Sequence, residues 1–196
     1  RKIVPKITKF AIDGIAFVSN KSSNDTLIAL KDVIGFMKGE RSSKIKGLVF
    51  DNPNSSTVNY MNNLSGLSNL PDKGVYTFKT NNEVLKFVSE NNGMIGVVGV
   101  NWLSQPEASM ESVIKSINVL SVKGFAKEGY YAPSQNNFAE GTYPLLRDVY
   151  IVNCQGYSGL GMGLASFAAG DIGQRIVLKS GLLPYKMPTR KLNIIR

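Results

Sequence analysis

A run of short polar side chains follows the apolar segment 47–50 and offers the most chemistry in this sequence. The order is Asp51-Asn52-Pro53-Asn54, then Ser55-Ser56-Thr57. Hydroxyl groups can donate hydrogen bonds to the oxygens of a tetrahedral ion. A helix N-terminus adds unpaired N–H groups and a partial positive charge. If a helix begins at these hydroxyls, the run is therefore a ready site for an anion.

The pattern around the hydroxyl cluster predicts a strand, a turn and a helix. Gly47 to Phe50 is a short apolar run that is typical of a buried strand, and the residues from Asp51 to Asn54 favour a turn. Apolar residues at 58, 61 and 64 then share one face of a helix. The alternative is that Asn54 or Ser55 serves only as the N-cap, because Ser and Asn are ordinary capping residues.

Composition places the chain among globular proteins that favour anionic partners. Its 196 residues are 43% hydrophobic and 19% charged, enough for one good-sized domain or two small lobes. The formal net charge of +9 favours small oxyanions, nucleic acid or acidic lipid. The basic residues form no block, no RNA-binding motif and no zinc-finger spacing, so we do not expect a nucleic-acid partner.

The residue inventory argues against an enzyme. The chain has no His and a single Cys, which removes the Ser-His-Asp and Cys-His nucleophile systems and most zinc sites. We therefore expect no catalytic residues, no metal and no cofactor. Cys154 ends an apolar run and is expected to be a small buried side chain. The sequence starts at Arg1 without Met, so the true N-terminus and any lipid anchor stay open.

Strand-like and helix-like segments alternate through the first hundred residues, which predicts an α/β fold with a parallel or mixed sheet. A long polar and aromatic stretch spans residues 123–142. The predicted strands are 10–19, 47–50, 75–78, 94–100, 117–122, 148–153 and a last short one at 191–195. The predicted helices are 26–37, 58–64, 83–90 with a cap at Asn81-Asn82, and 159–178 with a break near Gly170-Asp171.

Several segments together resemble the PstS-like phosphate-binding proteins of ABC transporters, in versions similar to those of Bacteroides-type bacteria. They appear in the family's order over about 170 residues. The segments are 11–16 (AIDGIA) with a helix ending at Gly39, the hydroxyls 55–57 after a strand, Ile95-Gly96, Tyr143-Pro144-Leu145 with Arg147, and Gly173-Gln174 followed by 181–184 (GLLP).

The resemblance implies a type 2 periplasmic-binding-protein fold, the Venus flytrap of two α/β lobes with an oxyanion between them. By position, it implies a hinge or crossover segment at 1–15, a second lobe at 16–125, and a return crossover with the C-terminal part of the first lobe at 126–196. The N-terminal part of the first lobe would precede this chain. One complete lobe and part of the other are therefore expected.

The resemblance also carries residue roles. Ser55, Ser56 and Thr57 match the family's Ser-Gly-Thr, which donates to phosphate, so we expect the oxyanion at Ser55, Ser56, Thr57, Asn54 and Asp51. The family's Arg falls at Asp51, where a carboxylate repels a dianion, accepts a proton from a protonated oxyanion, or holds the loop by an Asx-turn. Asp13 and Arg147 are candidate cleft or hinge residues, with a structural ion pair as the favoured role for Arg147.

We therefore expect a non-enzymatic phosphate or oxyanion binder that delivers its ligand to the membrane permease of an ABC importer. The alternative is a structural or protein-interaction module that reuses the fold without a small ligand, with self-association through an exposed apolar surface. The expected location is the cell envelope, either periplasmic or as a membrane-anchored lipoprotein.

Overall fold

A computed structural model describes residues 3–188, which fall into two compact units. The central unit comprises residues 14–146, and the terminal unit combines residues 1–13 with 147–196. The chain passes between the units within strand β1 (Lys6–Asn20), after Asp13, and within strand β8 (Leu146–Asn153), before Arg147. The boundaries 1–15, 16–125 and 126–196, which the resemblance implies for the hinge segment, the second lobe and the part of the first lobe, remain a prediction.

The central unit is built on a mixed sheet, as predicted. Its strands are β3 (Gly47–Phe50), β4 (Val75–Thr77), β5 (Met94–Gly99), β6 (Ile117–Val119) and the C-terminal part of β1. The strand order is β4-β3-β5-β1-β6. Strand β3 runs parallel to both β4 and β5, whereas β1 runs antiparallel to β5 and β6. A small parallel pair joins β2 (Leu27–Ala29) to β7 (Ser121–Lys123).

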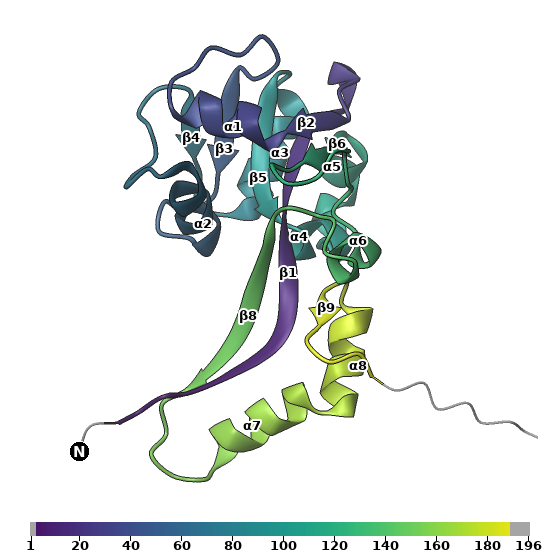
Figure 1. The fold of residues 1–196 in the computed structure, drawn as a ribbon. Coiled ribbons are helices and arrows are strands. Elements are labelled where there is room, and N and C mark those ends of the chain that lie inside the picture. The colour runs from purple at the N-terminus through teal and green to yellow at the C-terminus, as the bar shows by residue number, and fades with distance from the viewer. Residues whose placement is uncertain (1–2, 189–196) are drawn as a thin grey trace, which may run out of the picture. The chain divides into compact units, whose positions relative to one another are not determined.

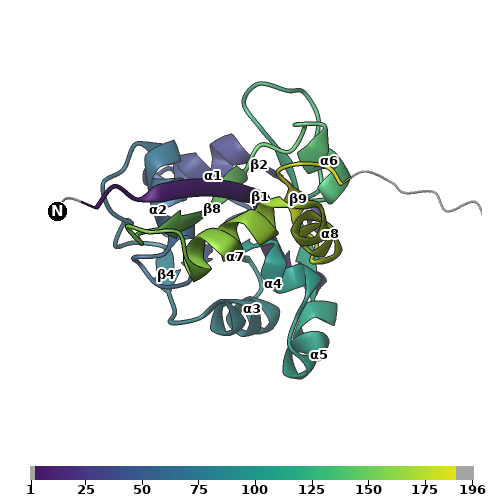
Figure 2. The ribbon, with the colours of Figure 1, turned by 90° about the horizontal axis from the view of Figure 1, so that it is seen from below.

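Helices cover both faces of this sheet. Helices α1 (Leu30–Met37) and α2 (Ser56–Ser65) lie on one side, and α3 (Asn81–Glu90) and α5 (Glu111–Lys115) lie on the other (Figure 2). Short helices α4 (Asn101–Ser104) and α6 (Gln135–Ala139) complete the unit, together with single 3₁₀ turns at Lys21–Ser23 and Ala108–Met110.

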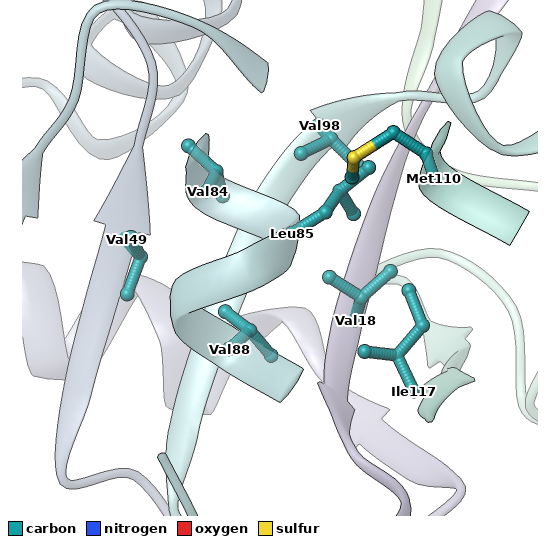
Figure 3. Packing of buried hydrophobic residues seen from close by; sticks show 8 residues of the cluster. All are labelled: Val18, Val49, Val84, Leu85, Val88, Val98, Met110 and Ile117. Atoms are coloured by element: carbon teal, nitrogen blue, oxygen red, sulfur yellow. The ribbon is translucent and has the colours of Figure 1, made fainter. Parts of the chain in front are cut away.

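The core on the α3 side explains why these segments fold together. Val84, Leu85 and Val88 of α3 pack against Val18 and Val49 of the sheet, with three more buried residues completing the cluster (Figure 3). Side chains of a strand alternate between the two faces of the sheet, so the residues next to Val18 and Val49 in the sequence point toward α1 and α2. They are buried as well. A Cβ on Gly96 would lie 2.8 Å from a methyl of Val18, so glycine allows this close approach.

The terminal unit joins the N-terminal part of β1 to two strands and two helices from the other end of the sequence. Strand β8 pairs with β1 (Figure 1), and β9 (Leu183–Pro184) pairs with Ala11 and Ile12 of β1. Between β8 and β9 lie α7 (Leu160–Ala169) and α8 (Asp171–Lys179), which confirms the predicted helix with its break near 170. The buried Gln174 side chain donates to the carbonyls of Phe10 and Ala168 at 2.9 and 2.7 Å and ties α8 to β1.

Four local predictions were wrong. The single strand predicted at 117–122 is two strands, β6 and β7, which belong to different sheets. Residues 27–29 form strand β2 and not the first turn of a helix, because their backbone pairs with β7. Helix α3 is capped by Thr80, whose hydroxyl accepts from the N–H of Glu83, and not by Asn81-Asn82. Cys154 is exposed, because it follows the end of β8. The strand predicted at 191–195 lies outside the described residues.

Candidate functional site

Two neighbouring parallel strands bring the candidate residues of the central unit to one edge of the sheet. Strand β3 ends at Phe50, directly before Asp51, and its neighbour β4 ends shortly before Thr80. Helix α2 begins after the first of these strand ends and α3 after the second. The carboxyl ends of parallel strands in an open α/β sheet are where ligands bind, so this edge is the natural place for a site.

The carboxylate of Asp51 is the centre of this cluster. Its Oδ1 accepts a hydrogen bond from Ser55 Oγ at 2.6 Å, and its Oδ2 accepts from Asn81 Nδ2 at 3.1 Å. The Asp51 residue is only 8% exposed. Among the described Lys and Arg residues none forms an ion pair with it. A buried carboxylate without a cation depends on its hydrogen-bond donors, so Ser55 and Asn81 hold Asp51 in place.

Ser55 is the N-cap of α2. Its Oγ accepts from the N–H of Val58 at 3.2 Å while its own proton goes to Asp51. A hydroxyl has a single proton to donate. Ser55 therefore orders the helix start, as the capping alternative expected, and has no second proton to donate to a ligand. Asn54 is exposed, and its N–H donates to Asn52 Oδ1 at 2.9 Å, which fixes the turn.

Ser56 and Thr57 occupy the first two positions of α2. Ser56 is exposed, whereas Thr57 is only 3% exposed. The positive end of the helix dipole lies at these residues. An anion at the N-terminus of α2 would thus lie near the Ser56 side chain and the first-turn backbone. The Asp51 carboxylate is next to this position, since it is bonded to the N-cap Ser55.

Asn81 is the residue of this cluster that the sequence did not reveal. Its Oδ1 is buried and accepts no hydrogen bond from any described residue. The available signal was indirect: residues 47–50 and 75–78 were both predicted as strands, each followed by a helix. Only their pairing as parallel neighbours places Asn81 beside Asp51.

Asp13 and Arg147 belong to the terminal unit, whereas residues 51–57 belong to the central unit. Arg147 Nη2 lies 2.6 Å from Asp13 Oδ2, and its Nε donates to the same oxygen at 3.0 Å. The two side chains are 19% and 6% exposed. The pair joins the two strands at the positions where the chain passes from one unit to the other. This is the ion pair that the sequence favoured for Arg147.

A second, exposed ion pair follows on the same two strands. Lys9 Nζ lies 2.6 Å from Asp148 Oδ1 and also sits over the Tyr185 ring. The hydrogen bond from Lys9 holds the pKa of Asp148 below its ordinary value, and the same bond raises the pKa of Lys9. The Tyr150 hydroxyl donates to Asp148 at 2.9 Å, which raises the pKa of Tyr150.

Comparison with known families decides the identity of the fold. The pattern of the PBP superfamily domain matches residues 5–171, which is most of the chain. The chain belongs to the PBP superfamily. A comparison with curated proteins finds no match. The PBP superfamily consists of solute-binding proteins, so the expectations of a periplasmic-binding-protein fold and of a protein that is not an enzyme are confirmed at the level of the family.

Solved structures with the same fold include several proteins assigned to phosphate uptake. A Clostridium perfringens protein, solved with bound phosphate and assigned as an ABC transporter substrate-binding protein, has a TM-score of 0.72 and 17% identity. The match covers 93% of this chain and 72% of that one. An ABC-type phosphate transport receptor from Vibrio cholerae has a TM-score of 0.68 and 19% identity, with 96% and 75% covered. PstS from Borrelia burgdorferi has a TM-score of 0.64 and 20% identity, with 95% and 78% covered.

Two kinds of feature are absent from residues 3–188. No helix there is long and apolar enough to cross a membrane. The same residues contain no group of three or more His, Cys, Asp or Glu side chains that could hold a metal ion.

Proposed function

We propose that this member of the PBP superfamily binds phosphate or a related oxyanion and delivers it to the membrane permease of an ABC importer. The observation that carries the proposal is the run from Asp51 to Thr57. It joins the end of β3 to the N-terminus of α2 and places Ser56 and Thr57 in the first helical turn. Helix N-termini with hydroxyl side chains are suited to tetrahedral oxyanions.

Asp51 would set the protonation state of the bound anion. Each carboxylate oxygen has a second lone pair beyond the one used by Ser55 or Asn81. A phosphate that carries a proton can donate it to such an acceptor, whereas sulfate at neutral pH has no proton and is only repelled. In this proposal the site therefore prefers phosphate over sulfate.

The pair between Asp13 and Arg147 would serve as a brace and not as a ligand contact. It links β1 to β8 at the two positions where the chain passes between the units. Both strands must keep their register there if the units are to move as bodies during capture and release. The cellular location in this proposal is the cell envelope, where the chain would be a periplasmic protein or a membrane-anchored lipoprotein.

The experiment is a calorimetric titration of the chain with phosphate at low salt, with sulfate for comparison. Ser56→Ala and Thr57→Ala should each weaken phosphate binding roughly tenfold or more, because a hydrogen bond to a charged group contributes about 1.5–3 kcal/mol. Thr57→Ser keeps the hydroxyl and is the matched control. Unchanged affinity in both alanine variants, with circular dichroism showing intact folds, would reject the assignment of the site.

The exposed apolar face of α7 and α8 favours a second candidate function, that of an interaction module. Five large apolar side chains on these helices are between 49% and 86% exposed: Leu160, Leu164, Phe167, Ile172 and Ile176. Exposed apolar side chains at helical spacing, as at Leu160, Leu164 and Phe167, share one face of a helix, and such faces often mark protein interfaces. Here the occupant would be a second copy of the chain, without any small ligand. Sedimentation velocity tests it: a monomer at all concentrations, with phosphate bound, excludes this function.

A further inference from the structure

An open groove of about 800 Å³ lies within the terminal unit. It is lined by the chain that leads into β1, by the loop after β8, and by the start of α7. Lys6 is the single charged residue among the nine described residues that line it. Since no described carboxylate lines the groove, its electrostatic preference is for an anion.

The N-terminus of α7 opens at this groove. Gly159 is the N-cap and supplies no side-chain cap. Instead, Gln155 reaches over, and its Oε1 accepts from the N–H of Gly161 at 3.0 Å. Ser158 and Met162, on either side of the helix start, both line the groove. The first turn of this ten-residue helix therefore directs its positive end toward a space that also holds a lysine.

Asn153 provides the observation that points to a ligand. The residue is 6% exposed, it lines the groove, and its Oδ1 accepts from the N–H of Gln155 at 2.9 Å. Because a backbone N–H pairs only with an acceptor, this bond orients the amide and leaves the NH₂ group on the other side. Asn153 Nδ2 is buried and donates to no acceptor in the described part of the chain. A buried donor without an acceptor costs free energy that a ligand oxygen would recover.

Gly161 shows that the backbone is built closely around Asn153. A Cβ at this position would lie 2.7 Å from Asn153 Oδ1 and 2.8 Å from Gln155 Oε1. A side chain at this position would displace both amide oxygens. The amide oxygen of Asn153 and the start of α7 therefore lie close together.

Apolar side chains also line the groove. Ile3, Val4 and Tyr157 are 59%, 79% and 70% exposed, and Met162 adds a thioether. A bare inorganic ion would leave these side chains in water. A ligand with an apolar group next to its charge would cover them and gain the free energy of burying that surface.

The distribution of charge agrees with an anion in this unit. The described residues of the terminal unit, 3–13 and 147–188, contain six Lys and Arg residues and three Asp and Glu residues, a net charge of +3. Residues 14–146 contain twelve and eleven, a net charge of +1. The described part of the smaller unit is therefore the more positive of the two.

We propose that this groove is a second binding site, for an organic anion such as a phosphate monoester or a carboxylate that carries an apolar group. Asn153 Nδ2, Lys6 and the first-turn N–H groups of α7 other than that of Gly161, which is bound to Gln155, bind the charged end. The side chains of Val4, Tyr157 and Met162 cover the apolar end. The site is separate from residues 51–57 and does not depend on the function proposed for them.

The test is a titration of the ¹⁵N-labelled chain with phenyl phosphate, followed by amide NMR shifts. We expect saturable shifts at residues 156–162 and at the side-chain NH₂ of Asn153. Asn153→Asp keeps the acceptor for Gln155 but replaces the donor with a negative charge, and should weaken binding at least tenfold. Lys6→Gln, at an exposed position, should weaken it several-fold. Lys179→Gln, an exposed lysine outside the groove, should leave it unchanged.

The outcomes separate this proposal from the site in the central unit. Ser56→Ala should leave the shifts at 156–162 intact, whatever it does to phosphate binding. Shifts confined to residues 51–58 would overturn the proposal. So would an affinity for phenyl phosphate in Asn153→Asp and in Lys6→Gln that equals the affinity of the unchanged chain. Equal affinity for inorganic phosphate and phenyl phosphate would overturn the assignment to an organic anion.

Discussion

Ser55 Oγ lies 2.6 Å from Asp51 Oδ1, so the N-cap of α2 is bound to a buried carboxylate. This negative charge lies beside the helix N-terminus that would attract an oxyanion. In Asp51→Asn the amide oxygen can still accept from Ser55, but the charge is gone. We expect sulfate affinity to rise roughly tenfold, about 1.4 kcal/mol, and the preference for phosphate over sulfate to fall.

Calorimetry of Asp51→Asn with the two anions measures this change directly. An unaltered ratio of the two affinities would mean that Asp51 has no part in selecting the ligand. Glu83→Gln is a suitable control, since it removes a carboxylate from the start of the adjacent helix α3, where Glu83 closes the capping box of Thr80.

The capping role of Ser55 predicts a stability change that is independent of any ligand. Ser55→Ala removes the acceptor for the Val58 N–H and one donor to Asp51. Loss of an N-cap typically costs about 1 kcal/mol, and the lost donor to a buried carboxylate adds to it. Urea unfolding measures the free energy. Ser55→Thr should recover most of the loss, and full stability in the alanine variant would contradict the capping role.

Arg147 is expected to be more important for stability than for binding. Asp13 is 5% exposed, and Arg147 donates two hydrogen bonds to its Oδ2. Arg147→Met leaves that carboxylate buried without its cation, which typically costs about 3–5 kcal/mol. In Arg147→Met with Asp13→Asn the buried charge is gone, and much of the stability should return. A loss that persists in full in the double variant would show that the ion pair is not its cause.

The hydroxyl site could be predicted because its signals are local. The apolar run 47–50, the turn residues after it and the spacing of Val58, Met61 and Leu64 lie within 18 consecutive residues, and the structure has the predicted strand and helix there. Asn81 could not be predicted in the same way. It reaches Asp51 only because β3 and β4 pair in parallel, and that pairing is a property of the whole sheet.

The errors have the same origin. Leu27 to Ala29 have a helix-like spacing with the residues that follow, but their backbone is used by β7, nearly a hundred positions later. Asn153 and Lys6 are unremarkable in the sequence. They line one groove because β1 and β8 pair and bring together chain segments that are about 147 positions apart. Tertiary pairing therefore decides what local pattern alone leaves open.

The pair between Lys9 and Asp148 predicts a pH dependence at the acidic end. The hydrogen bond from Lys9 lowers the pKa of Asp148 from its ordinary value of 3.8. The pair therefore contributes stability above pH 3.8, and this contribution is lost as the pH falls through the lowered pKa.

In Lys9→Gln the pKa of Asp148 should move back toward 3.8, as measured by NMR titration of its carboxyl carbon. Tyr150→Phe should cause a smaller shift in the same direction, because the Tyr150 hydroxyl is the weaker contributor. An Asp148 pKa that is the same with and without Lys9 would contradict the pairing.

Tyr143 predicts a pH dependence at the alkaline end. Its hydroxyl is buried and donates to the carbonyl of Ile15 at 2.6 Å, and burial raises its pKa well above the ordinary 10. The unfolded chain ionises this group near pH 10 and the folded chain does not, so stability falls as the pH rises beyond 10.

In an ultraviolet titration, one of the eight tyrosines should ionise only when the protein unfolds. Tyr143→Phe should remove that delayed step and cost about 1–3 kcal/mol, because the Ile15 carbonyl loses its donor. Tyr157→Phe, at a side chain that is 70% exposed, should leave the delayed step in place and the stability unchanged. Ionisation of Tyr143 near pH 10 with the fold intact would contradict the buried hydrogen bond.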